Sequence, residues 1–221
     1  MVEETWTRVD DYFASLLTHE DDALRRAVLA SASAGLPDIQ VTPTQGKLLQ
    51  ILASAVGARR ILEVGTLGGY STIWLARSLP ADGRLVTLEL EEAHATVARE
   101  NLSRAGVGQL VEVRTGDAKE SMRVMVEAGT EPFDLIFIDA DKESNPVYFG
   151  HALRLSHFGT LIIVDNVVRA GAVADASSED ARVRGTRALL DQASLDPRID
   201  GTAIQTVGAK GYDGFALIRV L

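Results

Sequence analysis

The sequence of 221 residues contains no cysteine. This absence excludes disulfide bonds, zinc–thiolate sites and a cysteine nucleophile. The chain also has no excess of basic residues, because 22 Lys and Arg stand against 31 Asp and Glu and give a net charge of −9. A general nucleic-acid binder needs a basic surface for its phosphate contacts, so we expect no nucleic-acid partner.

Long hydrophobic runs are missing as well. No apolar stretch is long enough to cross a bilayer, and the N-terminus is acidic rather than signal-like. We therefore expect no membrane partner and a cytoplasmic location. The four histidines show no metal-ligand spacing, and we assign them no role.

The length of the chain and its hydrophobic content of 46% suit one α/β domain with a sizeable core. We expect this domain to span residues 1–221, with a helical cover over residues 1–58 and a sheet core over residues 59–221.

Three segments of the expected cover have helical spacing. Apolar residues recur at this spacing over residues 6–17. Asp21 or Asp22 is predicted to cap the second helix, and Thr42 the third. The apolar faces predict packing onto the core, although a cover over a ligand pocket or a dimer surface would also explain them. Exposure of Trp6 or Tyr12 would favour the dimer.

The most informative stretch is RRILEVGTLGGYSTIW, residues 59–74. It predicts a buried strand, a glycine turn and a helix over residues 70–79, a unit that forms a nucleotide-shaped pocket. Leu67 occupies the second glycine position of the dinucleotide fingerprint G-x-G-x-x-G, so that fingerprint fails. Glu63 would repel a phosphate but would suit a cationic ligand such as S-adenosylmethionine. The pattern E-x-G-x-x-x-G resembles the loop of class I methyltransferases.

Strand and helix patterns alternate after this stretch. Further strands are expected over residues 83–90, 110–115, 133–140 and 159–166, and helices over residues 91–105, 118–128 and 145–156. This repetition predicts a parallel sheet with helices on both faces. Two last strands, residues 202–207 and 215–221, are joined by GAKGYDG, which is too short for a helical crossover and predicts an antiparallel hairpin. We therefore expect a seven-stranded, mostly parallel, Rossmann-like sheet of the class I methyltransferase type.

Acidic residues follow the ends of several expected strands. Glu89 ends the second strand, where its carboxylate can accept hydrogen bonds from ribose hydroxyls. Asp117 follows the third strand and could accept a hydrogen bond from an adenine amino group while it also caps the next helix.

The ends of the fourth and fifth strands carry Asp139 and the pair Asp165-Asn166. These strand ends face the same crevice of an open α/β sheet. Two carboxylates and an amide, without His or Cys, are oxygen ligands that a hard cation such as Mg²⁺ prefers. Lys142 lies close enough in the chain to point into the same crevice.

The motifs EVGTLGGYST, FIDADK and VDN, together with Glu89, occur in the order and spacing of a known family. The chain resembles the metal-dependent O-methyltransferases, the group of catechol and caffeoyl-CoA O-methyltransferases, and is most similar to their small bacterial members. The resemblance covers nearly the whole chain, including VTPTQGKLL and TVGAKGYDGFAL.

This resemblance implies transfer of a methyl group from S-adenosylmethionine to one hydroxyl of a vicinal diphenol of the catechol, caffeoyl or flavonoid type, by a homodimer. It implies cofactor contacts at Val41, Thr42, Glu63, Gly65, Ser71, Glu89, Asp117, Ala118 and Asp139. Asp139, Asp165 and Asn166 would hold a divalent cation, with Mg²⁺ expected. The catalytic residues would be Asp139 and Lys142, with Lys142 as the general base. The segment after Asn166 would face the substrate.

Two other function classes stay open at this point. One is a nicotinamide-dependent oxidoreductase, against which Leu67 in the glycine turn argues. The other is a non-catalytic dimeric module with the same fold. The intact set of Asp139, Lys142, Asp165 and Asn166 argues against such a module, because a scaffold needs none of them.

Overall fold

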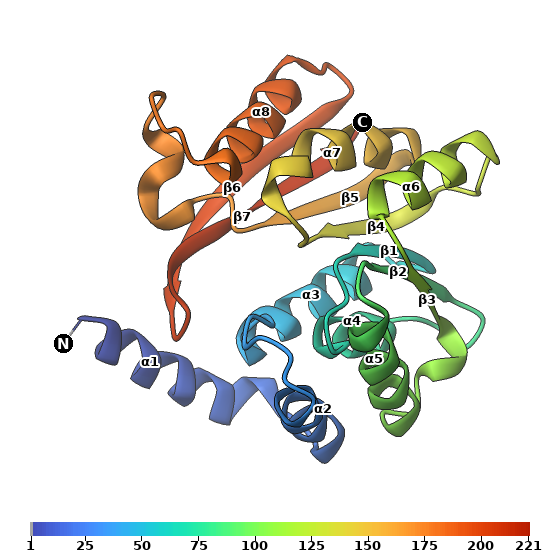
Figure 1. Ribbon diagram of the computed structural model, residues 1–221, viewed down its shortest axis with the longest axis vertical. Coiled ribbons are helices and arrows are strands. Elements are labelled where there is room, and N and C mark those ends of the chain that lie inside the picture. Colours follow the sequence, from blue (N-terminus) through green and yellow to red (C-terminus); the bar gives the residue numbers. More distant parts are fainter. Residues whose placement is uncertain (1) are drawn as a thin grey trace.

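A seven-stranded sheet lies at the centre of the molecule, in a computed structural model that describes residues 2–221 (Figure 1). The strands are β1 (Arg60–Val64), β2 (Arg84–Glu89), β3 (Val111–Thr115), β4 (Phe133–Ile138), β5 (Ser156–Asp165), β6 (Ile199–Gly208) and β7 (Gly211–Val220). Their order across the sheet is β3-β2-β1-β4-β5-β7-β6. Strand β7 runs antiparallel to both of its neighbours, and the other pairs are parallel. The predicted mostly parallel sheet with a terminal antiparallel hairpin is confirmed.

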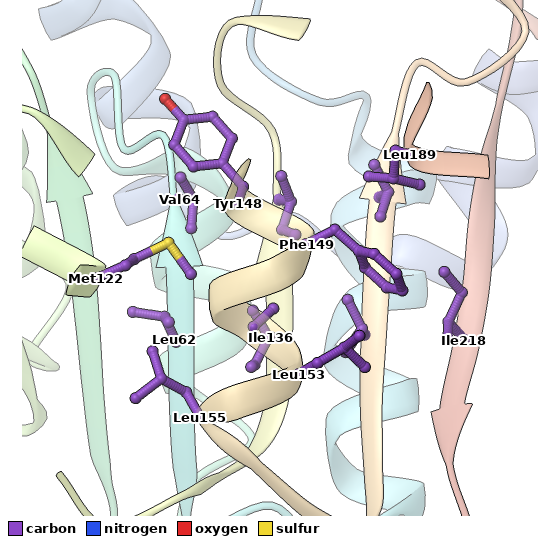
Figure 2. Close-up of a cluster of buried hydrophobic side chains, with 14 of the residues drawn as sticks. Leu62, Val64, Met122, Ile136, Tyr148, Phe149, Leu153, Leu155, Leu189 and Ile218 are labelled. Atoms are coloured by element: carbon purple, nitrogen blue, oxygen red, sulfur yellow. The ribbon is translucent and has the colours of Figure 1, made fainter. Parts of the chain in front are cut away.

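Helices cover both faces of this sheet, as predicted (Figure 1). They are α1 (Val2–Phe13), α2 (Asp22–Ser33), α3 (Pro43–Ala55), α4 (Tyr70–Ala76), α5 (Glu92–Arg104), α6 (Ala118–Glu127), α7 (Asn145–Arg154) and α8 (Ala181–Leu195). One face packs against α6, α7 and α8, where Phe149 and Leu153 of α7 join a cluster with Ile136 and Ile218 of the sheet (Figure 2). The opposite face packs against α2 to α5. Because both faces are covered, the central strands are apolar almost throughout.

Two of the N-terminal helices begin where the sequence predicts. The Asp21 carboxylate accepts a hydrogen bond from the backbone N–H of Leu24 (3.1 Å), and the Thr42 hydroxyl accepts one from Gln45 (3.3 Å). These caps satisfy backbone donors that the first helical turn leaves free. Helices α2 and α3 then bury apolar residues against α4 and α5, so their predicted packing is confirmed.

The first helix differs from the prediction. Its apolar residues and those of the turn after it are exposed: Val9, Tyr12, Phe13, Leu16 and Leu17. The expectation that they pack onto the core is wrong, because α1 extends past the sheet toward the tip of the β6–β7 hairpin (Figure 1). There the Asp10 carboxylate accepts a hydrogen bond from the backbone N–H of Ala209 (2.8 Å). Trp6 is half-buried, and Tyr12 is 62% exposed.

The terminal hairpin is longer than predicted. The segment GAKGYDG was expected to be a loop, but strand pairing continues from Gln205–Gly214 to Gly208–Gly211. This pairing was not recognisable from the sequence, because the segment consists largely of glycine and polar residues. The hydrogen bonds between two strands at an exposed sheet edge join backbone groups, so the side chains need not alternate between apolar and polar.

Helix α8 was not predicted. It begins in the last residues of the segment expected to face the substrate, VVRAGAVADASSEDARV (residues 167–183), continues beyond that segment, and buries Val183, Thr186 and Leu189. Gly185 lets it approach the 3-10 turn after β4, since a Cβ at this position would lie 2.1 Å from the carbonyl oxygen of Lys142. Helix α8 has few apolar residues, and they lie on one narrow face. The sequence therefore shows little of the helical periodicity by which such an element is recognised.

Within residues 2–221, no helix has both the length and the apolar character that a membrane span requires. The division of the domain at residue 58 stays a prediction.

Candidate functional site

A cavity of about 850 Å³ opens at the carboxyl ends of the parallel strands. Its volume is within the usual range for small-molecule and cofactor sites. The predicted site residues that line it are Val41, Gly65, Ser71, Glu89, Asp117, Ala118, Asp139, Lys142 and Asn166. A smaller cavity of about 270 Å³ adjoins it at Asn166 and is lined by Thr42 and Asp165. Of the predicted residues, Glu63 lines neither cavity.

The glycine turn between β1 and α4 forms one wall of the larger cavity. Gly65 has φ 101°, and a Cβ there would lie 2.2 Å from the carbonyl oxygen of Asp139. Gly69, with φ 81°, precedes the first residue of α4. The predicted turn is confirmed, and its glycines are needed for left-handed backbone and for close contact with the end of β4.

Glu63 lies beneath the cavity and is fully buried. Its carboxylate accepts hydrogen bonds from the hydroxyls of Ser71 (2.6 Å), Thr72 and Thr87 (2.7 Å). Burial raises the pKa of Glu63 to about 7, although these three donors oppose the change. Through Ser71 the carboxylate supports the cavity wall, while its own contact with a cofactor stays a prediction.

Glu89 holds the glycine turn against the end of β2. One carboxylate oxygen accepts hydrogen bonds from the backbone N–H groups of Thr66 (3.2 Å) and Leu67 (2.7 Å). The other accepts one from Glu91 (3.0 Å). Each carboxylate oxygen has two lone pairs, so the first oxygen is fully engaged and Glu89 keeps acceptor capacity only at the second, Oε1, which lies 3.4 Å from His94 Nδ1. Asp117 caps α6 by accepting a hydrogen bond from the backbone N–H of Lys119 (2.7 Å), as predicted.

Asp139, Lys142 and Asp165 form a charged group at the ends of β4 and β5, in which Lys142 and Asp165 are buried and Asp139 is half-buried. Lys142 Nζ lies 2.7 Å from Asp139 Oδ1, and the lysine is only 7% exposed. Asp165 is 5% exposed. Burial raises the pKa of Asp165, and the negative charge of Asp139 raises it further. Two carboxylates thus compete for the positive charge of one lysine.

Asn166 completes this group. Its backbone has φ 57°, a left-handed conformation that asparagine tolerates better than most residues. Its side-chain amide borders both cavities and has no hydrogen-bond partner among residues 2–221. Two crowded carboxylates beside a free amide oxygen fit a hard divalent cation. The described residues contain no cluster of three or more His, Cys, Asp or Glu, so any cation here depends on the amide.

Sequence reasoning missed several residues around the cavities. Tyr148 donates a hydrogen bond to the Asp141 carboxylate at the cavity wall (2.5 Å). Asp213 of β7 accepts hydrogen bonds from the backbone N–H groups of Val168 and Arg169, both at 3.0 Å. These partners come from different elements, and Asp213 lay in an expected loop, so no local pattern connected them.

The whole chain is similar to known proteins. A model of the O-methyltransferase family matches residues 15–221. A catechol O-methyltransferase from Niastella koreensis is 50% identical over 220 residues, which cover 100% of both chains. A catechol O-methyltransferase from Mycobacterium tuberculosis is 51% identical over 212 residues, which cover 96% of this chain and 94% of the relative.

Solved structures show the same similarity. The O-methyltransferase from Bacillus cereus in complex with S-adenosylhomocysteine has a TM-score of 0.97 and 54% identity, with 99% of each chain covered. The O-methyltransferase from Streptomyces achromogenes involved in tomaymycin synthesis, in complex with S-adenosylmethionine, has a TM-score of 0.96 and 50% identity, with 100% of this chain and 99% of the other covered. The predicted fold class is confirmed.

Proposed function

This chain belongs to the O-methyltransferase family, and we propose that it transfers the methyl group of S-adenosylmethionine to one hydroxyl of a vicinal diphenol with the help of a divalent cation. Its identity as an S-adenosylmethionine-dependent O-methyltransferase confirms the prediction from sequence. The alternatives of a nicotinamide oxidoreductase and of a non-catalytic module are set aside. The cation and the diphenol are the new elements of the proposal.

The observation that carries the proposal is the crowding of Asp139 and Asp165 around Lys142, beside the free amide of Asn166. Asp139, Asp165 and Asn166 would hold the cation, with Mg²⁺ the expected ion. A bound divalent cation supplies Lewis acidity, which lowers the pKa of a coordinated phenol from its ordinary value near 10. Two adjacent hydroxyls can chelate, which favours vicinal diphenols over single phenols.

The cofactor would lie in the larger cavity. We assign the ribose hydroxyls to Glu89, whose Oε1 keeps one lone pair free, and the adenine to Asp117 and Ala118. The remaining contacts concern the methionine part and its amino group: Val41, Thr42, Glu63, Gly65, Ser71 and Asp139. Because Glu63 is covered by three hydroxyl donors, its proposed effect passes through Ser71.

Methyl transfer is a direct displacement at carbon, so the chain must align a phenolate oxygen with the sulfonium. Fixed positions of donor and acceptor supply much of the acceleration. Lys142 is the proposed general base for the phenol proton. Its ion pair with Asp139 means that Lys142 can accept this proton only after it has released its own.

A product-resolved assay with labelled S-adenosylmethionine and catechol tests this function. We expect turnover that chelator abolishes and Mg²⁺ restores, and we expect the variants Asp139→Ala and Asp165→Ala to lose the metal-supported rate. Full activity of metal-stripped enzyme in excess chelator would contradict the proposal.

A homodimer is proposed from the exposed apolar residues of α1 and of the turn after it, such as Tyr12, which is 62% exposed, and Leu17, which is 66% exposed. Burial of such side chains against a second copy would be favourable. Light scattering that gives the mass of one 23.7 kDa chain at micromolar concentration would contradict this assembly.

A further inference from the structure

Four lysine and arginine side chains line the larger cavity, and acids neutralise three of them. The pairs are Lys119 with Asp117 (3.5 Å), Lys142 with Asp139 (2.7 Å) and Arg182 with Asp180 (2.9 Å). The fourth side chain, Arg169, has no hydrogen-bond or ion-pair partner within residues 2–221, and its Nε atom is buried. Nε is closed off, but the terminal guanidinium nitrogens are not among the buried atoms and have no acceptor within the described residues, which points to an acceptor supplied by a ligand in the cavity.

Asp180 does not fill this role. Hydrogen bonds from Arg182 lower the pKa of Asp180, and the positive charge of Arg169 helps to lower it, so Asp180 and Arg169 are near each other. Both carboxylate oxygens of Asp180, however, accept hydrogen bonds from Arg182 (3.2 and 2.9 Å). Asp180 itself does not line the cavity, whose wall carries further acids such as Glu91, Asp141 and Glu143. These acids would repel an anionic group of a ligand. Among the cations of the described chain that line the cavity, only Arg169 has no acid to neutralise it, so an anionic group would bind beside Arg169.

The backbone around Arg169 is held in an unusual conformation. Arg169, Ala170 and Gly171 are consecutive residues with φ of 55°, 54° and 89°. The Asp213 carboxylate fixes the start of this turn through the backbone N–H groups of Val168 and Arg169, both at 3.0 Å. Non-glycine residues keep a left-handed conformation only where their surroundings determine it. The unpaired guanidinium therefore sits on an anchored turn.

This turn lies on the side of the cavity where the acceptor is proposed to bind. Arg169 follows Asn166, a proposed metal ligand, by three residues, a span of at most about 11 Å even for extended chain. Most of the proposed contacts for the methyl donor come instead from β1, from the glycine turn and α4 that follow it, and from the ends of β2 and β3; the others are Val41, Thr42 and Asp139. An aromatic ring with its hydroxyls at Asn166 can therefore present a substituent to Arg169.

We propose that Arg169 binds a carboxylate on the phenolic acceptor, and that the preferred substrates are vicinal diphenols bearing a carboxylate, of the dihydroxybenzoate or dihydroxycinnamate type. Guanidinium groups bind carboxylates through two parallel hydrogen bonds, which orient the ligand as well as attract it. The proposal rests on the proposed function of the site and adds the acceptor's chemical class.

The test compares 3,4-dihydroxybenzoate with its uncharged methyl ester as acceptors for wild type, Arg169→Gln and Arg169→Lys. Arg154→Gln is the matched control, since Arg154 is exposed on α7 and does not line the cavity. In wild type we expect the carboxylate to have the higher kcat/KM. In Arg169→Gln the ratio of the two kcat/KM values should fall about tenfold or more, as expected for loss of a charge-assisted hydrogen bond. Arg169→Lys should recover part of the ratio, and Arg154→Gln should keep all of it.

Calorimetry with S-adenosylhomocysteine separates the acceptor's carboxylate from that of the donor. A tenfold loss of its affinity in Arg169→Gln, with an unaltered acceptor ratio, would assign Arg169 to the donor and overturn the proposal. Equal losses for the acid and the ester would reduce Arg169 to a structural role and overturn it too. Turnover of the ester by wild type without preference for the acid would refute the role of Arg169 but leave the proposed function intact. Absence of turnover with both acceptors would refute both.

Discussion

The substitution Glu63→Gln probes the buried carboxylate beneath the cavity. Glutamine has nearly the same shape, and its amide can exchange hydrogen bonds with the hydroxyls of Ser71, Thr72 and Thr87, which donate or accept. The substitution therefore removes the titration of Glu63 while it preserves packing. This separates the electrostatic cost of the carboxylate from its structural contribution.

The sign of the effect follows from burial, which raises the pKa of Glu63 from 4.5 to about 7. The folded protein then binds this proton more tightly than the unfolded chain does. The stabilising contribution of Glu63 is fully present below pH 4.5 and is lost as the pH rises through 7. At about 1.4 kcal/mol per pH unit, the wild type should lose about 2–3 kcal/mol from this group between pH 5 and pH 8.

Urea unfolding of wild type and Glu63→Gln at pH 5, 6, 7 and 8 measures this effect. The stability of the variant relative to wild type should increase by about 2–3 kcal/mol from the lowest pH to the highest. The difference between the two proteins cancels the titration of all other groups. Glu179→Gln removes one exposed carboxylate and serves as the control, for which we expect a constant difference. A constant difference for Glu63→Gln as well would refute the reasoning.

Four further substitutions test the site and the core. Glu89→Ala should weaken S-adenosylmethionine binding by about 1–3 kcal/mol, because ribose hydroxyls and loop N–H groups lose an acceptor, and calorimetry with wild-type affinity would remove Glu89 from the site. Lys142→Ala should lower kcat while cofactor affinity in the same calorimetric experiment stays close to wild type. Gly65→Ala should abolish cofactor binding, since a Cβ would lie 2.2 Å from the Asp139 carbonyl oxygen. Phe149→Ala should lower the free energy of unfolding by about 3–5 kcal/mol, and denaturant titration showing less than about 1 kcal/mol would contradict its place in the core.

The mostly parallel sheet with its terminal antiparallel hairpin and the position of the site were accessible from the sequence. The alternation of strand and helix patterns, with acids at the strand ends, predicted a sheet whose carboxyl edge gathers Glu89, Asp139 and Asp165. Parallel strands all end at the same edge, so residues far apart in the chain meet there without any knowledge of side-chain contacts. The glycines that follow the first strand likewise predicted a tight turn there, and Gly65 has the positive φ that such a turn uses.

Other features depended on tertiary structure because they arise between distant elements. The helical spacing of α1 is the same whether its apolar face is buried or exposed, and only the path of the chain decided that Tyr12 is open to solvent. The sequence placed Glu63 at a strand end, but the three hydroxyls that cover it come from α4 and β2. The anchoring of Arg169 by Asp213 joins residues 44 positions apart, and the lack of an acid beside that guanidinium is a property of the assembled cavity. Periodicity reports which face of an element is apolar, whereas the partners of a polar group are set by how the elements come together.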